Sequence, residues 1–235
     1  MSVYPGLVPV TDVHGWKTEA TQRLLGYTIA LTEEAWHEPS LLPGWSRAHV
    51  ATHLARNADH VRSIIEAAVA GRPQPPHPDS ERVRRELEIG ADRSGLELQI
   101  DLDSSAGALQ TAIEAVTDWT PTVVIDGAPL PLSAVPLMRL HEVYLHHLDL
   151  DCGFTADGVD PDAAAWLLRW TLFRLRAADL PAIQLQTESL ADEIGEGDSQ
   201  LRVRGTDARI WAWLTGRAGP EVVDGADGVR LPLLG

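Results

Sequence analysis

The chain has 235 residues, 44% of them hydrophobic, which is typical of a globular protein with one sizeable core or two modest ones. No apolar run approaches the roughly 18 residues of a membrane-spanning helix, and the first residues lack the basic and apolar regions of a secretory signal. The 34 acidic and 19 basic side chains give a net charge of −15, which would repel phosphate backbones and anionic lipid.

We therefore expect a cytoplasmic protein that binds neither nucleic acid nor membranes. The single cysteine, Cys152, excludes an internal disulfide framework and agrees with a reducing compartment. No long exposed apolar stripe is evident in the sequence, so we expect a monomer.

The first 150 residues predict helices interrupted by one hairpin. Helices are expected over 16–34, from Ser46 to about Ala70, from Glu81, over 106–119 and over 133–150. Ser46 suits an N-cap, and Gly71 begins a proline-rich loop over 72–80. In the segment 122–131, Asp126-Gly127 favours a type I′ turn between two short strands. The pattern predicts a four-helix bundle, a fold that often holds metal ligands on facing helices.

After Gly153 the pattern changes. Asp160 and Pro161 predict the start of a helix that ends near Ala178. Strands are expected over 182–189 and 199–206, a helix from 207 to about Gly216, and a short strand in the tail. The fold class is therefore predicted as α+β, with a helical bundle over 1–152 and a small α/β domain over 153–235.

A group of chemically active side chains lies in the last helix of the predicted bundle. Glu142 and His146 are four residues apart, so they lie one turn above each other and can reach one ion. Arg139 and Asp149 continue the same stripe, which spacing alone would assign to a solvated face. The rest of this helix is apolar over most of its circumference, which favours an internal cavity instead.

His53 is the natural third ligand, because it lies at the margin of the apolar stripe of the 46–70 helix. A hydrogen-bonded core histidine is the commoner fate of such a residue, and His49, four residues earlier, is a competing ligand. Two imidazoles and one carboxylate are what a catalytic zinc needs when its fourth position stays open. Asp149 is a candidate to hold a ligand histidine in the correct tautomer.

Two segments carry a family resemblance: SLLPGWSRAHVATHLARNA over 40–58 and RLHEVYLHHLDL over 139–150. They resemble the mycothiol-dependent maleylpyruvate isomerases, which belong to the DinB-like metalloenzymes. The similarity extends over nearly the whole chain, including the hairpin and a C-terminal domain that ends in TGRAG. The resemblance implies a DinB-like bundle whose metal ligands are His53, Glu142 and His146, and it makes His49 structural.

The resemblance also implies a reaction. The thiol of mycothiol would occupy the open position of the metal, where coordination favours the thiolate. Addition of the thiolate to the cis double bond of maleylpyruvate, rotation and thiolate expulsion would give fumarylpyruvate, as in the degradation of aromatic compounds. Arg217 matches an arginine that the family uses for the transient anion, although a helix C-terminal arginine is an equally ordinary alternative.

Arg82 and Arg85 are further candidates for binding the anionic substrate or the thiol, with a solvated helix face as the alternative. His141 stands where the family often has arginine, and His147 adds an imidazole beside His146. Because relatives on this scaffold include thiol S-transferases, conjugation of mycothiol to an electrophile is a rival function. A non-catalytic metal-binding or ligand-binding module is a third.

Overall fold

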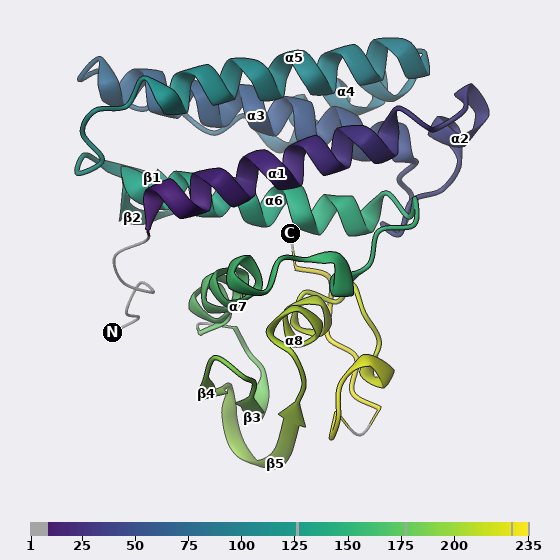
Figure 1. Cartoon of the computed structure of the whole chain (residues 1–235), viewed down its shortest axis with the longest axis vertical. Coiled ribbons are helices and arrows are strands. Elements are labelled where there is room, and N and C mark those ends of the chain that lie inside the picture. The colour runs from purple at the N-terminus through teal and green to yellow at the C-terminus, as the bar shows by residue number, and fades with distance from the viewer. Residues whose placement is uncertain (1–8, 126, 177, 227, 235) are drawn as a thin grey trace. The chain divides into compact units, whose positions relative to one another are not determined.

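The computed structural model describes residues 9–125, 127–176, 178–226 and 228–234. The chain divides into two compact units, one spanning Pro9–Gly153 and a second that begins at Phe154. Figure 1 labels the elements of both. None of the helices in the described part of the chain combines the length and apolarity that spanning a bilayer requires.

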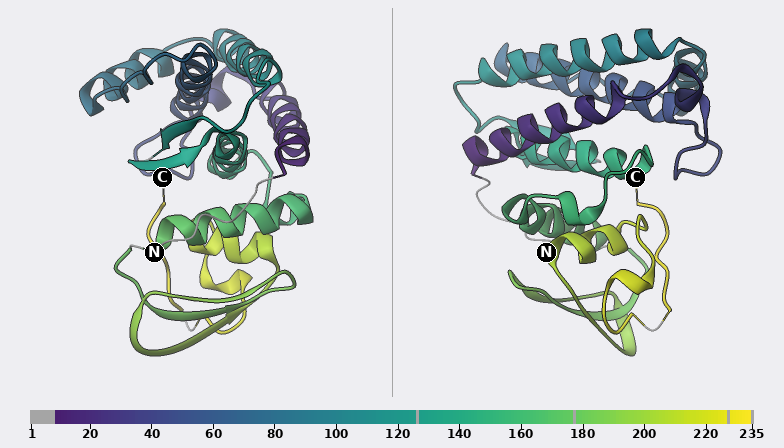
Figure 2. Two further views of the ribbon diagram at one scale, coloured as in Figure 1. Left: turned by 90° about the vertical axis from the view of Figure 1, so that its left-hand side faces the viewer. Right: turned by 45° about the vertical axis from the view of Figure 1, so that its right-hand side comes forward.

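The first unit is a bundle of four long helices. They are α1 (Val10–Thr28), α3 (Arg47–Val69), α5 (Gly95–Glu114) and α6 (Val135–Asp149). Each packs on two neighbours: α6 lies against α1 and α3, and α5 lies against the same two helices. Figure 2 shows them nearly end-on in its left panel. The short α2 (Glu33–His37) contacts α3 and α5, and α4 (Ser80–Ala91) packs on α3.

Helix starts follow local capping chemistry. Ser46 accepts from the backbone N–H of His49 and forms a capping box at the start of α3, as its sequence predicts. Ser94 and Glu97 form a second capping box. That box starts α5 at Gly95, so the helix expected over 106–119 begins eleven residues earlier and ends at Glu114.

The helix expected over 16–34 is also displaced. It begins at Val10 and ends at Thr28, and the chain then turns before Thr32 caps α2. Trp36 of α2 is buried, and its indole lies against Gly95 at the start of α5. The contact is so close that a Cβ at Gly95 would lie 2.3 Å from Cδ1 of Trp36, which explains a glycine at this position.

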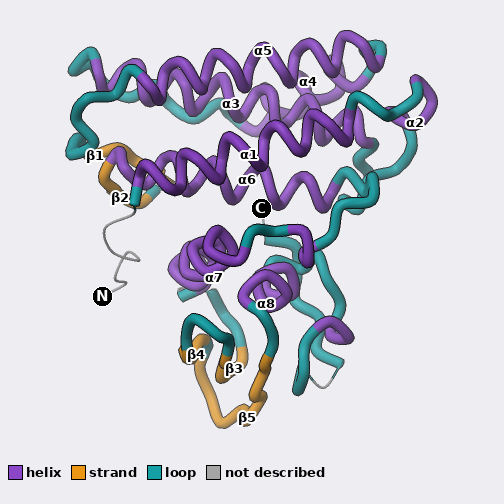
Figure 3. The backbone as a smooth tube through the Cα atoms, viewed as in Figure 1, coloured by secondary structure: helices purple, strands orange, loops and turns teal. Residues whose placement is uncertain are grey.

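A hairpin connects α5 to α6. It consists of β1 (Thr122–Ile125) and β2 (Ala128–Pro131), which pair antiparallel, followed by a 3-10 turn over Leu132–Ala134 (Figure 3). Gly127 has φ +78°, while Asp126 of the predicted type I′ turn lies outside the described residues. The side chain of Gln74 donates to the carbonyl of Val124 and accepts from its N–H, both at 2.8 Å, and so ties the proline-rich loop to β1.

The described residues of the second unit form a three-stranded sheet and two helices. Its helices are α7 (Pro161–Leu175) and α8 (Asp207–Leu214), which pack together. Its strands are β3 (Pro181–Gln186), β4 (Ala191–Ile194) and β5 (Glu196–Arg204), in the order β4-β3-β5. Short 3-10 turns cover Ala156–Gly158 and Pro220–Val222. Asp160 caps α7 through the N–H groups of Asp162 and Ala163, with Pro161 at the first helical position, as expected.

Two expectations for this unit are wrong. The segment between the two expected strands contains a third strand, β4, which pairs antiparallel with β3, while β3 and β5 run parallel. The tail contributes an isolated bridge between Asp224 and Arg204 in place of the short strand expected there. The fold class, an α+β chain with a helical bundle and a small α/β part, is confirmed.

Candidate metal centre

Three side chains of the bundle converge at the interface of α3 and α6. Nε2 of His53 on α3 lies 3.5 Å from Oε2 of Glu142 on α6. Nε2 of His146, one turn further along α6, lies 3.4 Å from the same oxygen. All three ligand atoms lie within 4.8 Å of one another. The structure therefore brings together the two histidines and the carboxylate that the sequence singles out as ligands.

Burial decides between the two interpretations of the α6 stripe. Arg139 is 4% exposed, His146 5% and Asp149 0%. The Glu142 side chain is 16% exposed, and that of His53 is 28% exposed. The solvated-face alternative for this stripe is therefore wrong, because α6 is enclosed on this side by α3.

Asp149 lies behind the histidine ligand. Its Oδ2 is 2.8 Å from Nδ1 of His146, and the carboxylate is fully buried. A carboxylate at Nδ1 favours the tautomer that carries its proton there, which leaves the lone pair of Nε2 directed at Glu142 and His53. The interaction therefore orients the ring for binding a metal through Nε2.

The protonation of the trio follows from burial and mutual hydrogen bonding. Burial lowers the pKa of His53, although its hydrogen bond with Glu142 acts in the opposite sense. For His146, burial alone would lower the pKa, but hydrogen bonds with Asp149 and Glu142 outweigh it and raise the pKa. Burial would raise the pKa of Glu142, yet its hydrogen bonds with the two histidines hold it well below the ordinary value. The centre thus contains an ionised carboxylate.

The separations fit a tetrahedral ion. With Zn–N and Zn–O distances of about 2.0–2.1 Å, neighbouring ligand atoms of a tetrahedral site lie about 3.3–3.4 Å apart. The 3.4 Å and 3.5 Å separations from Glu142 to the two imidazoles match this edge length closely. These residues therefore fit a divalent ion held by three protein ligands, with a fourth position left for an exchangeable ligand.

A polar chain that the sequence analysis did not identify supports Glu142. Nδ2 of Asn57 lies 3.5 Å from Oε2 of Glu142, and Oδ1 of Asn57 accepts a 2.5 Å hydrogen bond from Nη1 of Arg139. Burial lowers the pKa of Arg139 to about 10, so the guanidinium remains charged at neutral pH. Asn57 lies four residues after His53, and Arg139 lies three residues before Glu142. Each therefore shares a helix face with a ligand, and this spacing was the signal that could have identified both residues.

Behind Arg139 lies a second buried cation that the sequence analysis missed. Lys17 of α1 is 3% exposed, and its ammonium group donates to Oε1 of Gln110 on α5. Burial and the nearby charge of Arg139 lower the pKa of Lys17 to about 8. Two basic side chains, Arg139 and Lys17, thus lie buried in the described part of the bundle, and the charge of Arg139 interacts with the ionised Glu142.

The other histidines named from the sequence, and Cys152, lie outside the trio. His49 completes the cap of α3, where its Nδ1 lies 3.2 Å from the backbone N of Ser46 and 2.7 Å from the Ser46 hydroxyl. His141 and His147 are fully buried, and burial lowers the pKa of His147 to about 3. Cys152 is half-buried, and burial raises the pKa of its thiol.

The candidate arginines lie at three kinds of position. Arg82 and Arg85 are both exposed on α4, and Nε of Arg82 lies 2.8 Å from Glu86. Arg82 lines the cavity described below, while Arg85 does not. Arg217 belongs to the second unit, just beyond α8, where Nη1 donates to the carbonyl oxygens of Thr215 and Leu234. Its contact with the carbonyl of Thr215, the C-cap of α8, is the ordinary structural role considered for this arginine.

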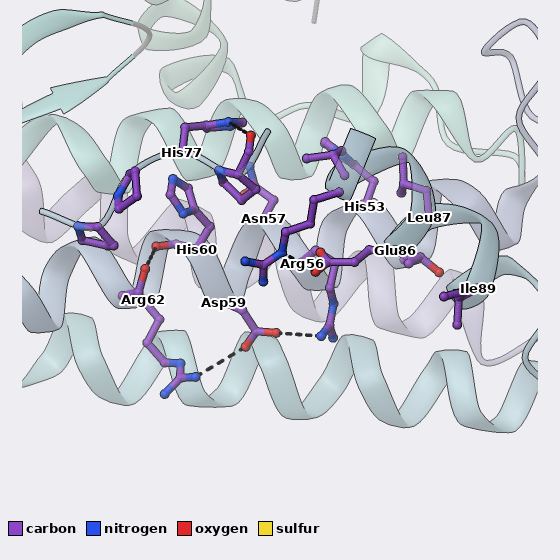
Figure 4. Close-up of a pocket in the computed structure, with 18 of the residues that line it drawn as sticks. His53, Arg56, Asn57, Asp59, His60, Arg62, His77, Glu86, Leu87 and Ile89 are labelled. Atoms are coloured by element: carbon purple, nitrogen blue, oxygen red, sulfur yellow. Dashed lines mark hydrogen bonds and ion pairs between the residues drawn. The ribbon is translucent and has the colours of Figure 1, made fainter. Parts of the chain in front are cut away.

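A cavity of about 750 Å³ lies within the first unit, and His53 is the member of the trio that lines it. His53 and Asn57 form part of its wall on α3, and the proline-rich loop and α4 form the other sides. Figure 4 shows His53, Asn57 and His60 in succession along α3. A molecule in the cavity could therefore reach the exposed part of His53.

Comparisons with known proteins agree with this architecture. Two solved structures, a mycothiol-dependent maleylpyruvate isomerase and a histidine-to-alanine mutant of it, superpose with TM-scores of 0.85 and 0.86. Each is 22% identical in sequence, and each match covers 96% of this chain and 95% of the other. A comparison with curated proteins gives no match. The family described as the mycothiol maleylpyruvate isomerase N-terminal domain matches residues 18–151, more than half of the chain, and the chain belongs to that family.

Proposed function

We propose that the chain is a metal- and thiol-dependent isomerase that acts on maleylpyruvate or a similar unsaturated keto acid, with mycothiol as its thiol. One observation carries the proposal: two imidazoles converge on one ionised carboxylate, each at a separation from it that fits a tetrahedral ion. Family membership supports the choice of thiol and substrate class.

In this proposal His53, Glu142 and His146 hold a divalent ion such as zinc. The bound ion would leave one position for a thiol and favour its thiolate. The thiolate is a nucleophile that none of the three ligand residues supplies. Burial keeps His53 neutral, so its Nε2 lone pair is available. Asp149 holds the Nδ1 proton of His146, and Asn57 fixes the carboxylate of Glu142.

Three arginines have proposed roles with the anionic substrate or the thiol. We assign to Arg217 the stabilisation of negative charge that develops on the substrate carbonyl, because its planar guanidinium can donate two parallel hydrogen bonds. Arg82 lines the cavity next to His53 and is proposed to contact the bound molecule. Arg85, exposed on the same helix, is proposed to attract an anion to this face of an acidic protein.

The decisive experiment measures maleylpyruvate turnover by zinc-loaded protein with and without mycothiol. The proposal predicts fumarylpyruvate as the product, a requirement for the thiol, and no net thiol consumption. His53→Ala should abolish both zinc binding at the trio and turnover, while the control His37→Ala, at an exposed position of α2, should change neither.

Two results would replace the proposal. A stable thiol adduct as end product, with thiol consumed in proportion, would show an S-transferase. Protein that binds no divalent metal and turns over no thiol-dependent substrate would show a non-catalytic module.

A further inference from the structure

A second pair of histidines lies further along α3, away from the trio (Figure 4). His60 on α3 and His77 of the proline-rich loop have ring centroids 5.1 Å apart, with their ring planes at 75°. His60 is seven residues from His53, which is about 10 Å along the helix at 1.5 Å per residue. The ions of a two-metal catalytic centre lie about 3.5–4 Å apart, so an ion between His60 and His77 would be separate from one at the trio.

The geometry of this pair resembles that of the two histidines in the trio. The ring centroids of His53 and His146 are 4.6 Å apart, with their ring planes at 69°. Zn–N distances of about 2.0–2.1 Å place each ring centroid about 3.2 Å from a tetrahedral ion, and therefore place two such centroids about 5.2 Å apart. The 5.1 Å separation of the His60 and His77 rings fits one shared ion.

The ring nitrogens decide between ligation and simple packing, because edge-to-face rings also pack with centroids about 4.5–7 Å apart. Nδ1 of His77 lies 2.8 Å from the carbonyl oxygen of Pro78, so this nitrogen carries the proton and Nε2 keeps the lone pair. A backbone carbonyl at one ring nitrogen is a usual partner of a histidine that binds a metal through the other. The ring of His60 makes no hydrogen bond within the described part of the chain, so it too can offer a lone pair.

The surroundings of the pair favour a cation. Burial and the neighbouring His77 lower the pKa of His60, so its ring is neutral at pH 7. Pro76 and Pro78 flank His77, and each proline ring fixes its own φ, so the loop loses less conformational entropy when His77 binds an ion. The net charge of −15 attracts cations to the protein as a whole.

We propose that His60 and His77 form a second site for a divalent transition metal, in which two imidazoles and solvent hold an ion such as Zn²⁺. Imidazole suits Zn²⁺, Ni²⁺ and Cu²⁺, whereas Mg²⁺ and Ca²⁺ prefer oxygen ligands. The bound ion fastens the proline-rich loop to α3, in addition to the bonds between Gln74 and Val124. The site goes beyond the proposed function, because neither ligand belongs to the trio and no thiol or substrate takes part.

Titration of the metal-free, full-length protein with Zn²⁺ tests the inference by isothermal titration calorimetry. The wild type should bind two zinc ions per chain. The second ion should bind at least about tenfold more weakly than the first, because it has one protein ligand fewer than an ion at the trio. Loss of a residue that only supports a ligand costs about 10-fold to 100-fold in metal affinity, so loss of one of two ligands should cost at least about tenfold.

His77→Ala and His60→Ala should each raise the Kd of the weaker site by at least about tenfold and leave the tighter site unchanged. His77 is exposed in the loop, so its substitution leaves the packing of the bundle intact. His53→Ala should have the reciprocal effect, removing the tighter site and leaving the weaker one. Circular dichroism establishes that each variant keeps its helices.

His37→Ala is the matched control. Nε2 of His37 lies 3.7 Å from Oε1 of Glu33 on the surface of α2, so this exposed pair is an alternative place for a weakly bound ion. The inference predicts that both sites of His37→Ala bind zinc like those of the wild type.

A wild type that binds one zinc ion per chain would overturn the inference. An unchanged weaker site in His77→Ala would overturn it as well, and so would loss of that site in His37→Ala. None of these results bears on the proposed function, which fails instead if protein with zinc at the trio does not isomerise maleylpyruvate with mycothiol.

Discussion

Asp149 offers the sharpest test of how the bundle prepares its metal centre. Its carboxylate is fully buried and lies 2.8 Å from Nδ1 of His146, so it holds one tautomer of a ligand whose other nitrogen faces the trio. Loss of such a supporting partner typically lowers metal affinity 10-fold to 100-fold, or about 1.4–2.7 kcal/mol. Two substitutions of Asp149 are expected to give the lower and the upper end of this range.

Asp149→Asn keeps an oxygen acceptor and removes the charge, so we expect zinc affinity to fall about tenfold. Asp149→Leu removes both the acceptor and the charge at similar volume, and we expect a fall of about 100-fold. Zinc affinity is measured at neutral pH by competition with a chelator of known affinity. Circular dichroism establishes that each variant keeps the helical bundle.

The matched control is Asp151→Asn, which makes the same chemical change two residues further on. Asp151 is exposed and has φ +48°, a conformation that asparagine tolerates well, so zinc affinity should not change. If folded Asp149→Leu binds zinc as tightly as the wild type, the carboxylate does not support the ligand and the reasoning fails.

Three further predictions concern stability. Lys17 has a folded pKa of about 8 against about 10.4 in the unfolded chain, so the unfolded state binds more protons between these values and wild-type stability rises with pH across that window. Lys17→Met should remove this rise and stabilise the fold by about 2 kcal/mol near neutral pH, as measured by urea unfolding; equal slopes in both proteins would contradict it. His147, buried with a folded pKa of about 3, should contribute full stability above its unfolded pKa of about 6.5 and lose it as the pH falls, by about 2 kcal/mol near pH 5. His147→Leu should flatten that acid dependence in the same assay, and an unchanged slope would count against it. Gly95→Ala should cost about 1–3 kcal/mol, because the added Cβ meets Trp36 at 2.3 Å; tryptophan fluorescence during urea unfolding reports the midpoint, and a variant as stable as the wild type would show that the indole relaxes freely.

The elements that the sequence predicted well are those whose signals are local. Ser46 and Gly71 mark the limits of α3, and Asp160 with Pro161 marks the start of α7. The beginning of α5 was missed although Ser94 and Glu97 form a capping box, because the residues that follow are acidic and their apolar periodicity is weak. β4 was missed for a related reason: it is short and acidic, and its pairing with β3 supplies the stability that its composition does not.

In the candidate site, too, the residues that could be predicted are those whose signals are local. Glu142 and His146 share one helix face, so their proximity followed from spacing, while the choice of His53 over His49 rested on the family resemblance. The chain through Asn57 and Arg139 was not predicted, because its contacts join residues 82 and 85 positions apart on different helices. Lys17 was missed similarly, since its partner Gln110 lies 93 residues away. Such contacts depend on how helices pack, which spacing within one helix does not specify.

The side-chain amide of Gln74 protects an exposed strand edge from pairing with other chains. Val124 is opposite Pro129 in the hairpin, and both its N–H and its C=O bond to Gln74, so these peptide groups face the outer edge of the sheet and not β2. Unpaired edges of this kind recruit strands from other chains and start aggregation. The side chain of Gln74 presents one donor and one acceptor to Val124, as a single residue of a third strand would. The N–H and C=O of Val124 are therefore already paired, and this half-exposed residue offers no template for intermolecular pairing.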